Sequence, residues 1–206
     1  MTAVSTLLGL VERKEQGPSP VFSKEHALLA FLTIGAAGEI GRQALARSLN
    51  LGEGSMRTVL KKFSQAGYVE ADTLGCHLTP SGRRLHASIL KNIPSMVAVS
   101  DSQVGVGRSQ VAVLVRPPGG PAANGLDQRD SAIRIGATGA TTYVIKDGKF
   151  AIPGNSPDCE RDFPGPVWRV LRSELAPGDG DVVILCGAAD ETTARLGALS
   201  AALTLL

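Results

Sequence analysis

The sequence predicts an α+β protein with two domains, and three observations lead to this prediction. Apolar residues recur at helical spacing through residues 42–65, and a short hairpin pattern follows over residues 68–78. The composition changes near residue 95, where a helical segment bearing many Lys and Arg residues gives way to a segment rich in Val, Gly, Thr and turn signals. A chain of 206 residues is long enough for two small domains.

Two adjacent helical segments, residues 42–49 and 55–65, are separated by a break. We expect glycines at 52 and 54 to make this turn, because glycine adopts a sharply turned backbone at the least cost. The second segment has an apolar stripe at positions i, i+3, i+4 and i+7, formed by Met56, Val59, Leu60 and Phe63. Its opposite face is basic and hydroxylated, and comprises Ser55, Arg57, Thr58, Lys61, Lys62 and Gln65. Such a face suits a helix that enters the major groove of DNA.

The following residues predict a hairpin and a further helix. Gly67 is placed as a helix-ending glycine, and residues 68–72 and 76–78 read as two strands joined by a turn. Thr79-Pro80 is a helix start, with a hydroxyl N-cap and proline at the first helical position. With one more helix expected over residues 24–34, this order of elements is that of a winged helix-turn-helix.

Residues 44–85 contain Leu-Gly-Glu-Gly-Ser-Met-Arg-Thr-Val-Leu-Lys-Lys-Phe, then Ala-Gly-Tyr-Val, then Leu-Thr-Pro-Ser-Gly-Arg-Arg-Leu. This segment resembles prokaryotic winged-helix transcriptional regulators, the archaeal ones most closely, and the resemblance extends over residues 1–95. The second half resembles an uncharacterised archaeal domain found behind such winged helices, on the strength of Asp-Ser-Ala-Ile at 130–133 and Gly-Ala-Thr-Gly-Ala-Thr-Thr at 136–142. That domain has no established chemistry to carry over.

The expected function is therefore sequence-specific binding of double-stranded DNA by a homodimer that reads an inverted repeat. We expect Ser55, Arg57, Thr58 and Lys61 to face base edges. We expect Lys62, Thr73, His77, Arg83 and Arg84 to contact phosphates. Charge supports this assignment modestly, because residues 1–95 carry 11 Lys and Arg against 7 Asp and Glu, whereas residues 96–206 carry 10 against 12.

The domain limits expected from the pattern are an N-terminal helix and linker at 1–22, the DNA-binding winged helix at 23–95 and an α+β domain at 100–206. We expect the α+β domain of this transcriptional regulator to bind an effector or to dimerise. The first helix should cover residues 5–14, and its apolar residues Leu7, Leu8, Leu10 and Val11 could form a dimer seam or belong to a partly ordered tail. Three widely spaced cysteines indicate reduced thiols in the cytoplasm. No run of residues is long enough to cross a membrane, so no membrane partner is expected.

The second domain should contain about four or five strands and two helices. The expected strands are residues 109–116, 131–135, 141–145, 149–152 and 181–186, with Asp147-Gly148 as a hairpin turn. Residues 117–127 and 153–166 should be loops. Residues 167–175 should be helical, and Asp190 should cap a final helix over residues 193–206. With aromatic residues at only 4%, the core should be aliphatic and rich in alanine.

The segment 136–142 is the candidate effector site, because its small residues would let backbone amides approach a ligand. Gly136, Thr138, Gly139, Thr141 and Thr142 are the residues expected to contact such a small molecule. The alternative is a tight connection between two strands whose glycines only permit positive φ. The segment has neither the Gly-Lys-Ser/Thr ending nor the following helix of a phosphate-binding loop.

An enzymatic second domain is the alternative function, in the form of a winged helix fused to a nucleotide-dependent, kinase-like domain. Residues 171–183 distantly resemble the end of the archaeal riboflavin kinase barrel, but no matching substrate motif precedes them. The second domain has no histidine, and neither Cys159 nor Cys186 is accompanied by a base, so no catalytic residue and no cofactor are expected. A metal site built on Cys76 and His77 is disfavoured, because adjacent strand residues point to opposite faces. A winged helix used only for protein contacts is disfavoured by its basic face.

Overall fold

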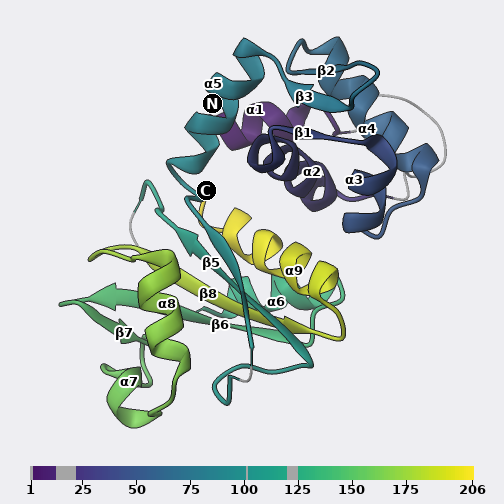
Figure 1. The fold of residues 1–206 in the computed structure, drawn as a ribbon. Coiled ribbons are helices and arrows are strands. Elements are labelled where there is room, and N and C mark those ends of the chain that lie inside the picture. The colour runs from purple at the N-terminus through teal and green to yellow at the C-terminus, as the bar shows by residue number, and fades with distance from the viewer. Residues whose placement is uncertain (1, 13–21, 101, 120–124) are drawn as a thin grey trace. The chain divides into compact units, whose positions relative to one another are not determined.

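The computed structural model describes residues 2–12, 22–100, 102–119 and 125–206, and the chain divides into two compact units, Met1–Ile89 and Leu90–Leu206 (Figure 1). Within the described residues, no helix combines the length and the apolar character needed to cross a bilayer. The predicted α+β class is confirmed, with one sheet of three strands and one of five. We predicted that the winged helix ends at residue 95 and that the second domain begins at residue 100. That these segments fold independently remains a prediction.

The first unit has the element order of a winged helix. Its elements are α1 (Ala3–Gly9), α2 (Lys24–Ala37), β1 (Glu39–Ile40), α3 (Arg42–Ser48), α4 (Glu53–Gln65), β2 (Val69–Ala71), β3 (Cys76–Leu78) and α5 (Pro80–Leu90). The three strands form an antiparallel sheet in the order β1-β3-β2. Every helix and strand predicted between residues 24 and 90 is present, and the two-residue strand β1 is additional.

Helix α2 forms the centre of the first unit, since apolar residues occur on nearly all of its sides. Ala27, Leu28, Phe31 and Ile34 are fully buried. The Phe31 ring meets the Phe63 ring of α4 edge-on at 5.4 Å. Helix α1 packs against α2 and buries Leu7 and Leu8 within the same chain. A first helix was predicted over residues 5–14, but α1 covers Ala3–Gly9 and so begins and ends earlier. Residues 13–21 lie outside the described part of the chain.

Local signals predicted the ends of α4 and α5 correctly. Gly67 has φ +73°, as a glycine that follows a helix does. The Thr79 hydroxyl accepts the Gly82 amide at 2.9 Å and donates to the Gly67 carbonyl at 2.7 Å. A Cβ at Gly82 would collide with the Tyr68 carbonyl, so α5 can pack closely against the chain before β2 only with glycine there.

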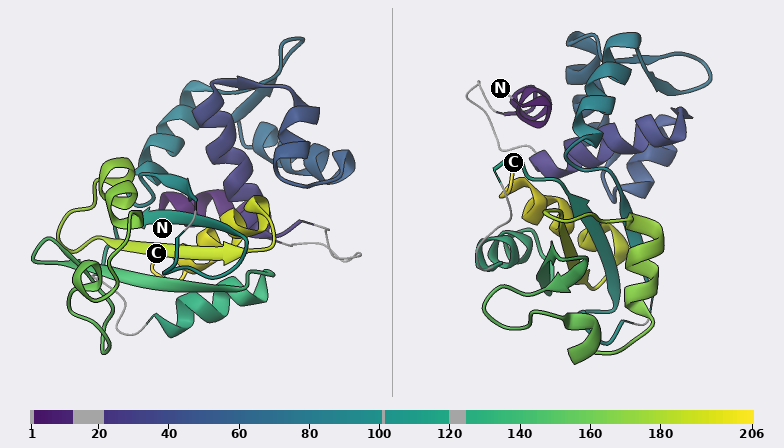
Figure 2. Two further views of the ribbon diagram at one scale, coloured as in Figure 1. Left: turned by 60° about the horizontal axis from the view of Figure 1, so that its bottom comes forward. Right: turned by 90° about the vertical axis from the view of Figure 1, so that its left-hand side faces the viewer.

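The second unit is an antiparallel sheet with helices on both faces. Its elements are β4 (Met96–Val99), β5 (Ser109–Val115), α6 (Leu126–Arg134), β6 (Gly139–Lys146), β7 (Lys149–Ala151), α7 (Cys159–Asp162), α8 (Val167–Leu175), β8 (Val182–Ala188) and α9 (Glu191–Leu203). The strand order is β4-β5-β8-β6-β7, and every neighbouring pair is antiparallel. In the right-hand view of Figure 2 the sheet lies between α8 on one side and α6 with α9 on the other.

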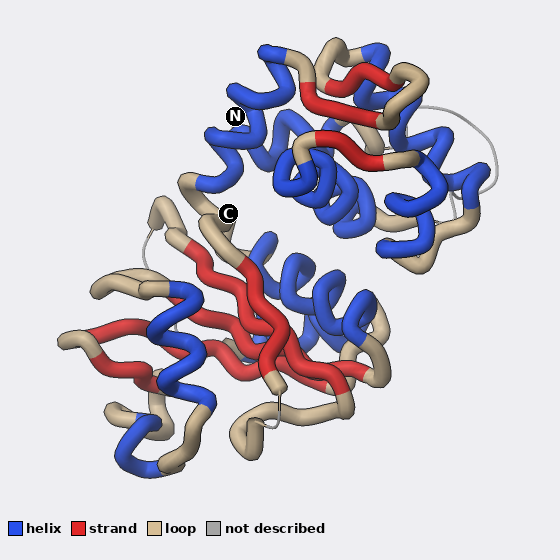
Figure 3. Tube along the Cα trace, in the orientation of Figure 1, coloured by secondary structure: helices blue, strands red, loops and turns tan. Residues whose placement is uncertain are grey.

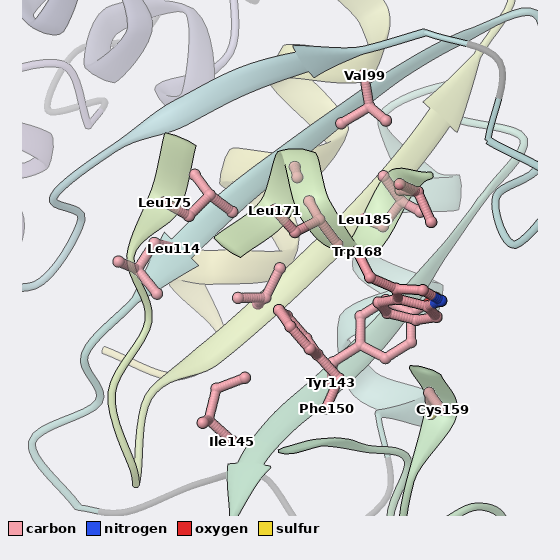
Figure 4. Packing of buried hydrophobic residues seen from close by; sticks show 13 residues of the cluster. Val99, Leu114, Tyr143, Ile145, Phe150, Cys159, Trp168, Leu171, Leu175 and Leu185 are labelled. Carbon is pink, nitrogen blue, oxygen red and sulfur yellow. The ribbon is translucent and has the colours of Figure 1, made fainter. Parts of the chain in front are cut away.

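The two faces of this sheet differ in their packing. Towards α9, alanines such as Ala194, Ala198 and Ala201 are fully buried, as the composition predicted. The other face concentrates the aromatic residues, because Trp168 of α8 meets Tyr143 edge-on at 5.3 Å and lies 5.2 Å from Phe150 (Figure 4). Three of the four aromatic residues of the second unit thus lie in one cluster with α8, whereas Phe163 is 47% exposed.

Several predictions for the second unit are confirmed. Helix α8 spans the predicted residues, and β5 is buried along most of its length as expected. Asp147 and Gly148 have φ +52° and +71°, which is the backbone of a two-residue hairpin turn. The Asp190 carboxylate accepts the Thr193 amide at 2.9 Å and so caps α9.

The predicted strand at residues 131–135 was wrong, because these residues belong mostly to α6. Ile133 and Ile135 alternate with polar residues and so suggest a strand, but Ile133 is 47% exposed. The side chains that α6 buries are Gln128 and Ala132, which are spaced by one helical turn. The short helix α7 lies in a predicted loop, and strand β4 was not predicted. The described residues of this unit thus hold two more helices than expected.

Candidate nucleic-acid interface

The connection between α3 and α4 is fixed by one left-handed residue and one side-chain contact. Asn50 has φ +51°, a conformation that asparagine tolerates, and the Leu51 amide then donates to the Ala46 carbonyl at 2.9 Å. The Gln43 amide donates to the Glu53 carboxylate at 3.1 Å and links the two helices. Gly52 has φ −65°, so the expectation that glycines 52 and 54 make this turn was wrong.

Helix α4 presents the polar face that the sequence predicted. Its stripe of Met56, Val59, Leu60 and Phe63 is buried, while Arg57, Thr58 and Lys61 are exposed. At 100° per residue, Arg57, Lys61 and Ser64 fall on one stripe of the exposed face. Ser55 and Lys62 lie on its far flank, where both are only half exposed.

The hairpin of β2 and β3 forms the wing, and its tip is held by one carboxylate. Asp72 accepts the backbone amides of Leu74 at 2.8 Å and Gly75 at 3.1 Å. These two bonds hold the pKa of Asp72 below its ordinary value, because they stabilise the charged carboxylate. Gly75 lies so close to the Ile40 carbonyl that a Cβ would meet it at 2.8 Å. These contacts define the conformation of the tip, which exposes 77% of Leu74.

A groove of about 680 Å³ lies between helices α3 and α4 and the wing. Its basic side chains are Arg42 and Arg47 from α3 and Arg57 and Lys61 from α4. Asp72 is the one carboxylate that lines it. Among the described residues, none of these four cations forms an ion pair or a side-chain hydrogen bond. The four positive charges of the groove thus exceed the single negative charge of Asp72 in its lining.

The structure brings together some of the predicted DNA-contacting residues and not others. Arg57, Lys61 and Thr73 line the groove, and Thr58 lies beside it with its hydroxyl on the Gly54 carbonyl. His77 is outside the groove lining, 3.6 Å from the Glu70 carboxylate and 3.8 Å from that of Asp72.

The two arginines of α5 are held by acceptors within the chain. Arg83 donates to the Leu78 carbonyl at 2.8 Å, and Arg84 donates to the Ser81 hydroxyl at 2.9 Å. Arg42 and Arg47 line the groove but were not among the predicted DNA-contacting residues. Their positions on the helix before the turn could have indicated that they share a surface with α4.

The predicted effector segment is a turn followed by a strand. Gly136, with φ +102°, follows α6, and β6 begins at Gly139, so the expected placement between two strands was wrong. The Thr138 amide already donates to the Gly187 carbonyl at 2.8 Å. Thr141 and Thr142 are adjacent on β6 and therefore point to opposite faces of the sheet. The segment does not gather its hydroxyls around one point.

The charged loops and cysteines of the second unit are engaged in structure. Burial raises the pKa of the Cys186 thiol to about 12, and burial is also the main cause of the raised pKa of Cys159. The charged side chains beside Cys159 form ion pairs: Lys149 with Asp158, Arg161 with Asp162, and Arg172 with Glu160. The sheet is open at β4 and β7, unlike the barrel that residues 171–183 suggested.

Comparisons with known proteins match the two halves of the chain separately. A family model described as "PH0730-like, N-terminal domain" matches residues 28–84, and one described as "Domain of unknown function (DUF4443)" matches residues 106–205. The solved structure of hypothetical protein PH0730 from Pyrococcus horikoshii OT3 is 25% identical with a TM-score of 0.74, over 89% of this chain and 92% of that chain. None of the curated proteins compared with the chain matches it.

Two further solved structures match less than half of the chain. The MarR family protein Rv2887 of Mycobacterium tuberculosis is 24% identical over 41% of this chain and 57% of that chain, with a TM-score of 0.31. Its complex with DNA is 26% identical over 42% and 58%, with a TM-score of 0.30. The likeness to PH0730, in contrast, extends through both units, and the chain is similar to that archaeal protein over nearly its whole length.

Proposed function

We propose that this protein is a sequence-specific, DNA-binding transcriptional regulator that uses the groove between α3, α4 and the wing. The observation that supports the proposal most is the set of four exposed cations, Arg42, Arg47, Arg57 and Lys61, around one groove without a carboxylate partner among the described residues. Cations in this state can release counterions from DNA phosphates without first breaking an internal ion pair.

In this proposal α4 enters the major groove. Arg57, Lys61 and Thr58 face base edges, since all three are exposed on the polar face of the helix. Arg42 and Arg47 contact phosphates on one side, and Thr73 does so from the wing. Ser55, which was expected at a base edge, and Lys62 reach the backbone at the margin. Arg83 and Arg84 keep donors available for phosphate beside their internal bonds. His77 would reach a phosphate by giving up its contact with Glu70 or with Asp72.

Two copies related by a twofold axis would read an inverted repeat, and the second unit is the part that would join or switch them. A small effector can switch such a dimer only if it binds the DNA-competent and incompetent states unequally. Residues 136–142 remain the proposed effector-binding segment. This segment connects α6 to β6 and includes the first residues of β6. All three cysteines are buried free thiols, in keeping with the proposed cytoplasmic location.

The proposal is tested by replacing Arg57 with alanine in the full chain. We expect specific binding to weaken by about 1–3 kcal/mol and one base position to become less restricted. The measurement is a fluorescence anisotropy titration of a duplex recovered by selection and of a random duplex at the same salt concentration. Arg169→Ala is the matched control, because Arg169 is an exposed arginine of α8 in the other unit.

Equal losses on the selected and the random duplex would show that Arg57 contacts only phosphate. No loss on either duplex, or the same loss in Arg169→Ala, would contradict the assignment of the groove. We propose no catalytic role for the second unit, and nucleotide turnover by the full chain would contradict that part of the account.

A further inference from the structure

The five-stranded sheet, whose strands are drawn in red in Figure 3, has two margins, β4 and β7. The two margins differ in chemistry. The β7 margin carries a charge, since Lys149 pairs with Asp158 at 3.0 Å, and just beyond β7 the chain folds back so that Ile152 bridges to Ser156. The β4 margin reads Met-Val-Ala-Val at residues 96–99, without a charge or a proline. Natural proteins protect a sheet margin by keeping its strand short, by charge, proline or a bulge, or by covering it with another element. Both margins have short strands, of four residues in β4 and three in β7. The β4 margin lacks the protection that β7 has.

The pairing of β4 with β5 determines which main-chain groups face outward. The Leu114 amide donates to the Ser95 carbonyl at 3.0 Å, and the register places Val97 opposite Ala112. Bonded and non-bonded pairs alternate along an antiparallel ladder, so the amides and carbonyls of Met96 and Ala98 point away from β5. Among the described residues, these groups have no hydrogen-bond partner.

We propose that β4 is the self-association surface of this protein, where it pairs antiparallel with β4 of a second copy. With the twofold axis at Val97, Met96 of each copy faces Ala98 of the other, and their outward amides and carbonyls form four hydrogen bonds. The two β4 strands then join the two sheets into one continuous sheet across the axis.

A second copy is the occupant that the side chains favour. The pairing sets the long Met96 against the small Ala98 twice, so the two strands complement each other without a clash. Val97, which packs against the apolar cluster under α8, meets its own copy at the non-bonded position, where Cα atoms approach most closely. An uncharged margin also brings no like charges together across the axis. The predicted seam through Leu7 and Leu8 is less suited, because both side chains are already buried within one chain.

The first test is sedimentation velocity of the full chain over a range of concentrations. Ala98→Pro removes an outward amide and leaves the β4–β5 ladder intact, and Ala98→Lys adds a protective charge to the same margin. We expect a concentration-dependent dimer whose dissociation constant rises about tenfold or more in both variants, while the thermal unfolding of the dilute, monomeric chain stays unchanged. Ala98→Thr is the control and should dimerise like the parent. A chain that stays monomeric at about 100 µM, or a dimer that both variants leave intact, would overturn the proposal.

The second test is disulfide trapping, which also reads the register. Val97→Cys should form an intermolecular disulfide on mild oxidation, because the two residues face each other across the axis. Met96→Cys should crosslink much less, since each Met96 faces Ala98 of the other copy. Equal crosslinking of both variants, or none, would contradict this register. DNA binding by a monomer would survive either failure, so these outcomes are separate from those that test the proposed function.

Discussion

The two units of this protein use their positive charges in opposite ways. In the second unit, six cations form ion pairs, namely Arg116, Arg129, Lys149, Arg161, Arg172 and Arg195. In the first unit, no Lys or Arg among the described residues pairs with a carboxylate, and the ion pairs found there involve only His77. The Lys and Arg side chains of the first unit thus lack carboxylate partners among the described residues, as the proposed binding of DNA requires, whereas the second unit uses its cations locally.

The hydrogen bonds of individual arginines show the same contrast. Arg172 donates to both oxygens of Glu160 and to the Gly148 carbonyl, and it lies 5.2 Å above the Phe150 ring. Arg42, Arg47 and Arg57 have no such partners among the described residues, although they lie around one groove. The first arrangement holds a loop in place, and the second leaves its arginines available for the proposed contacts with phosphate.

The largest effect should follow from removing the α3 cations together. Arg42→Ala/Arg47→Ala should lower affinity for every duplex about tenfold or more, and should reduce the slope of log affinity against log salt by about 2. Folding should be nearly unchanged, because neither side chain leaves a carboxylate without a partner among the described residues. Titrations at several salt concentrations measure both quantities.

The paired arginines of the second unit provide the control for that result. Arg129→Ala/Arg161→Ala removes the same formal charge, and its DNA affinity and salt slope should stay close to those of the parent. A similar loss in this variant would show that net charge matters and that the position of the charge in the groove does not.

A smaller effect is expected when Arg172 is replaced by alanine. The pair with Glu160 is partly exposed, so solvent screening limits its contribution, and we expect the free energy of unfolding to fall by about 1 kcal/mol. Urea unfolding followed by Trp168 fluorescence measures this change, because Trp168 lies in the cluster beside Phe150. Arg169→Ala should change stability by much less. A loss as small as that of the control would show that Arg172 does not fasten the loop.

The smallest effect is that of pH on the free energy of unfolding. It should arise in the first unit, because all three histidines lie there. Burial lowers the pKa values of His26 and His86 below their ordinary value of 6.5. Below pH 6.5 the unfolded chain therefore takes up protons before the folded one, and stability is lost as the pH falls. His26 adds to this loss, because its Nδ1 accepts the Ser23 amide at 3.2 Å only while it is unprotonated.

The variant that tests this prediction is His86→Phe, which keeps a ring near Gly35 and Phe31. Urea unfolding between pH 7.5 and pH 5 should show a smaller loss of stability in the variant than in the parent. Stability that increases as the pH falls through this window would contradict the sign of the argument.

Long periodic segments could be predicted from the sequence, whereas features that depend on pairing could not. Helices α4 and α8 carry apolar residues at helical spacing, and strand β5 is a nearly continuous apolar run, so each of these patterns reports burial directly. Strands β1 and β4 are short, and they are strands only because β3 and β5 lie beside them. Helix α6 was mistaken for a strand because Ile133 is exposed rather than buried.

The same limit applied to the candidate site. Arg57 and Lys61 could be found from the spacing on one helix, but the groove also needs Arg42 and Arg47, which only the turn at Asn50 brings to the same surface. Conversely, Thr141 and Thr142 are adjacent in sequence and suggested one site, yet the strand separates them. Residues that are adjacent in the sequence do not share a site in a strand, because successive side chains point to opposite faces.

The most direct test of the central claim is selection of bound sequences from a randomised duplex pool by the full chain at near-physiological salt. The account predicts enrichment of an inverted repeat, and the Arg42→Ala/Arg47→Ala variant should recover the same motif with lower affinity. Weak, salt-sensitive binding without an enriched motif, or no binding at all, would contradict the claim that the basic groove reads DNA sequence.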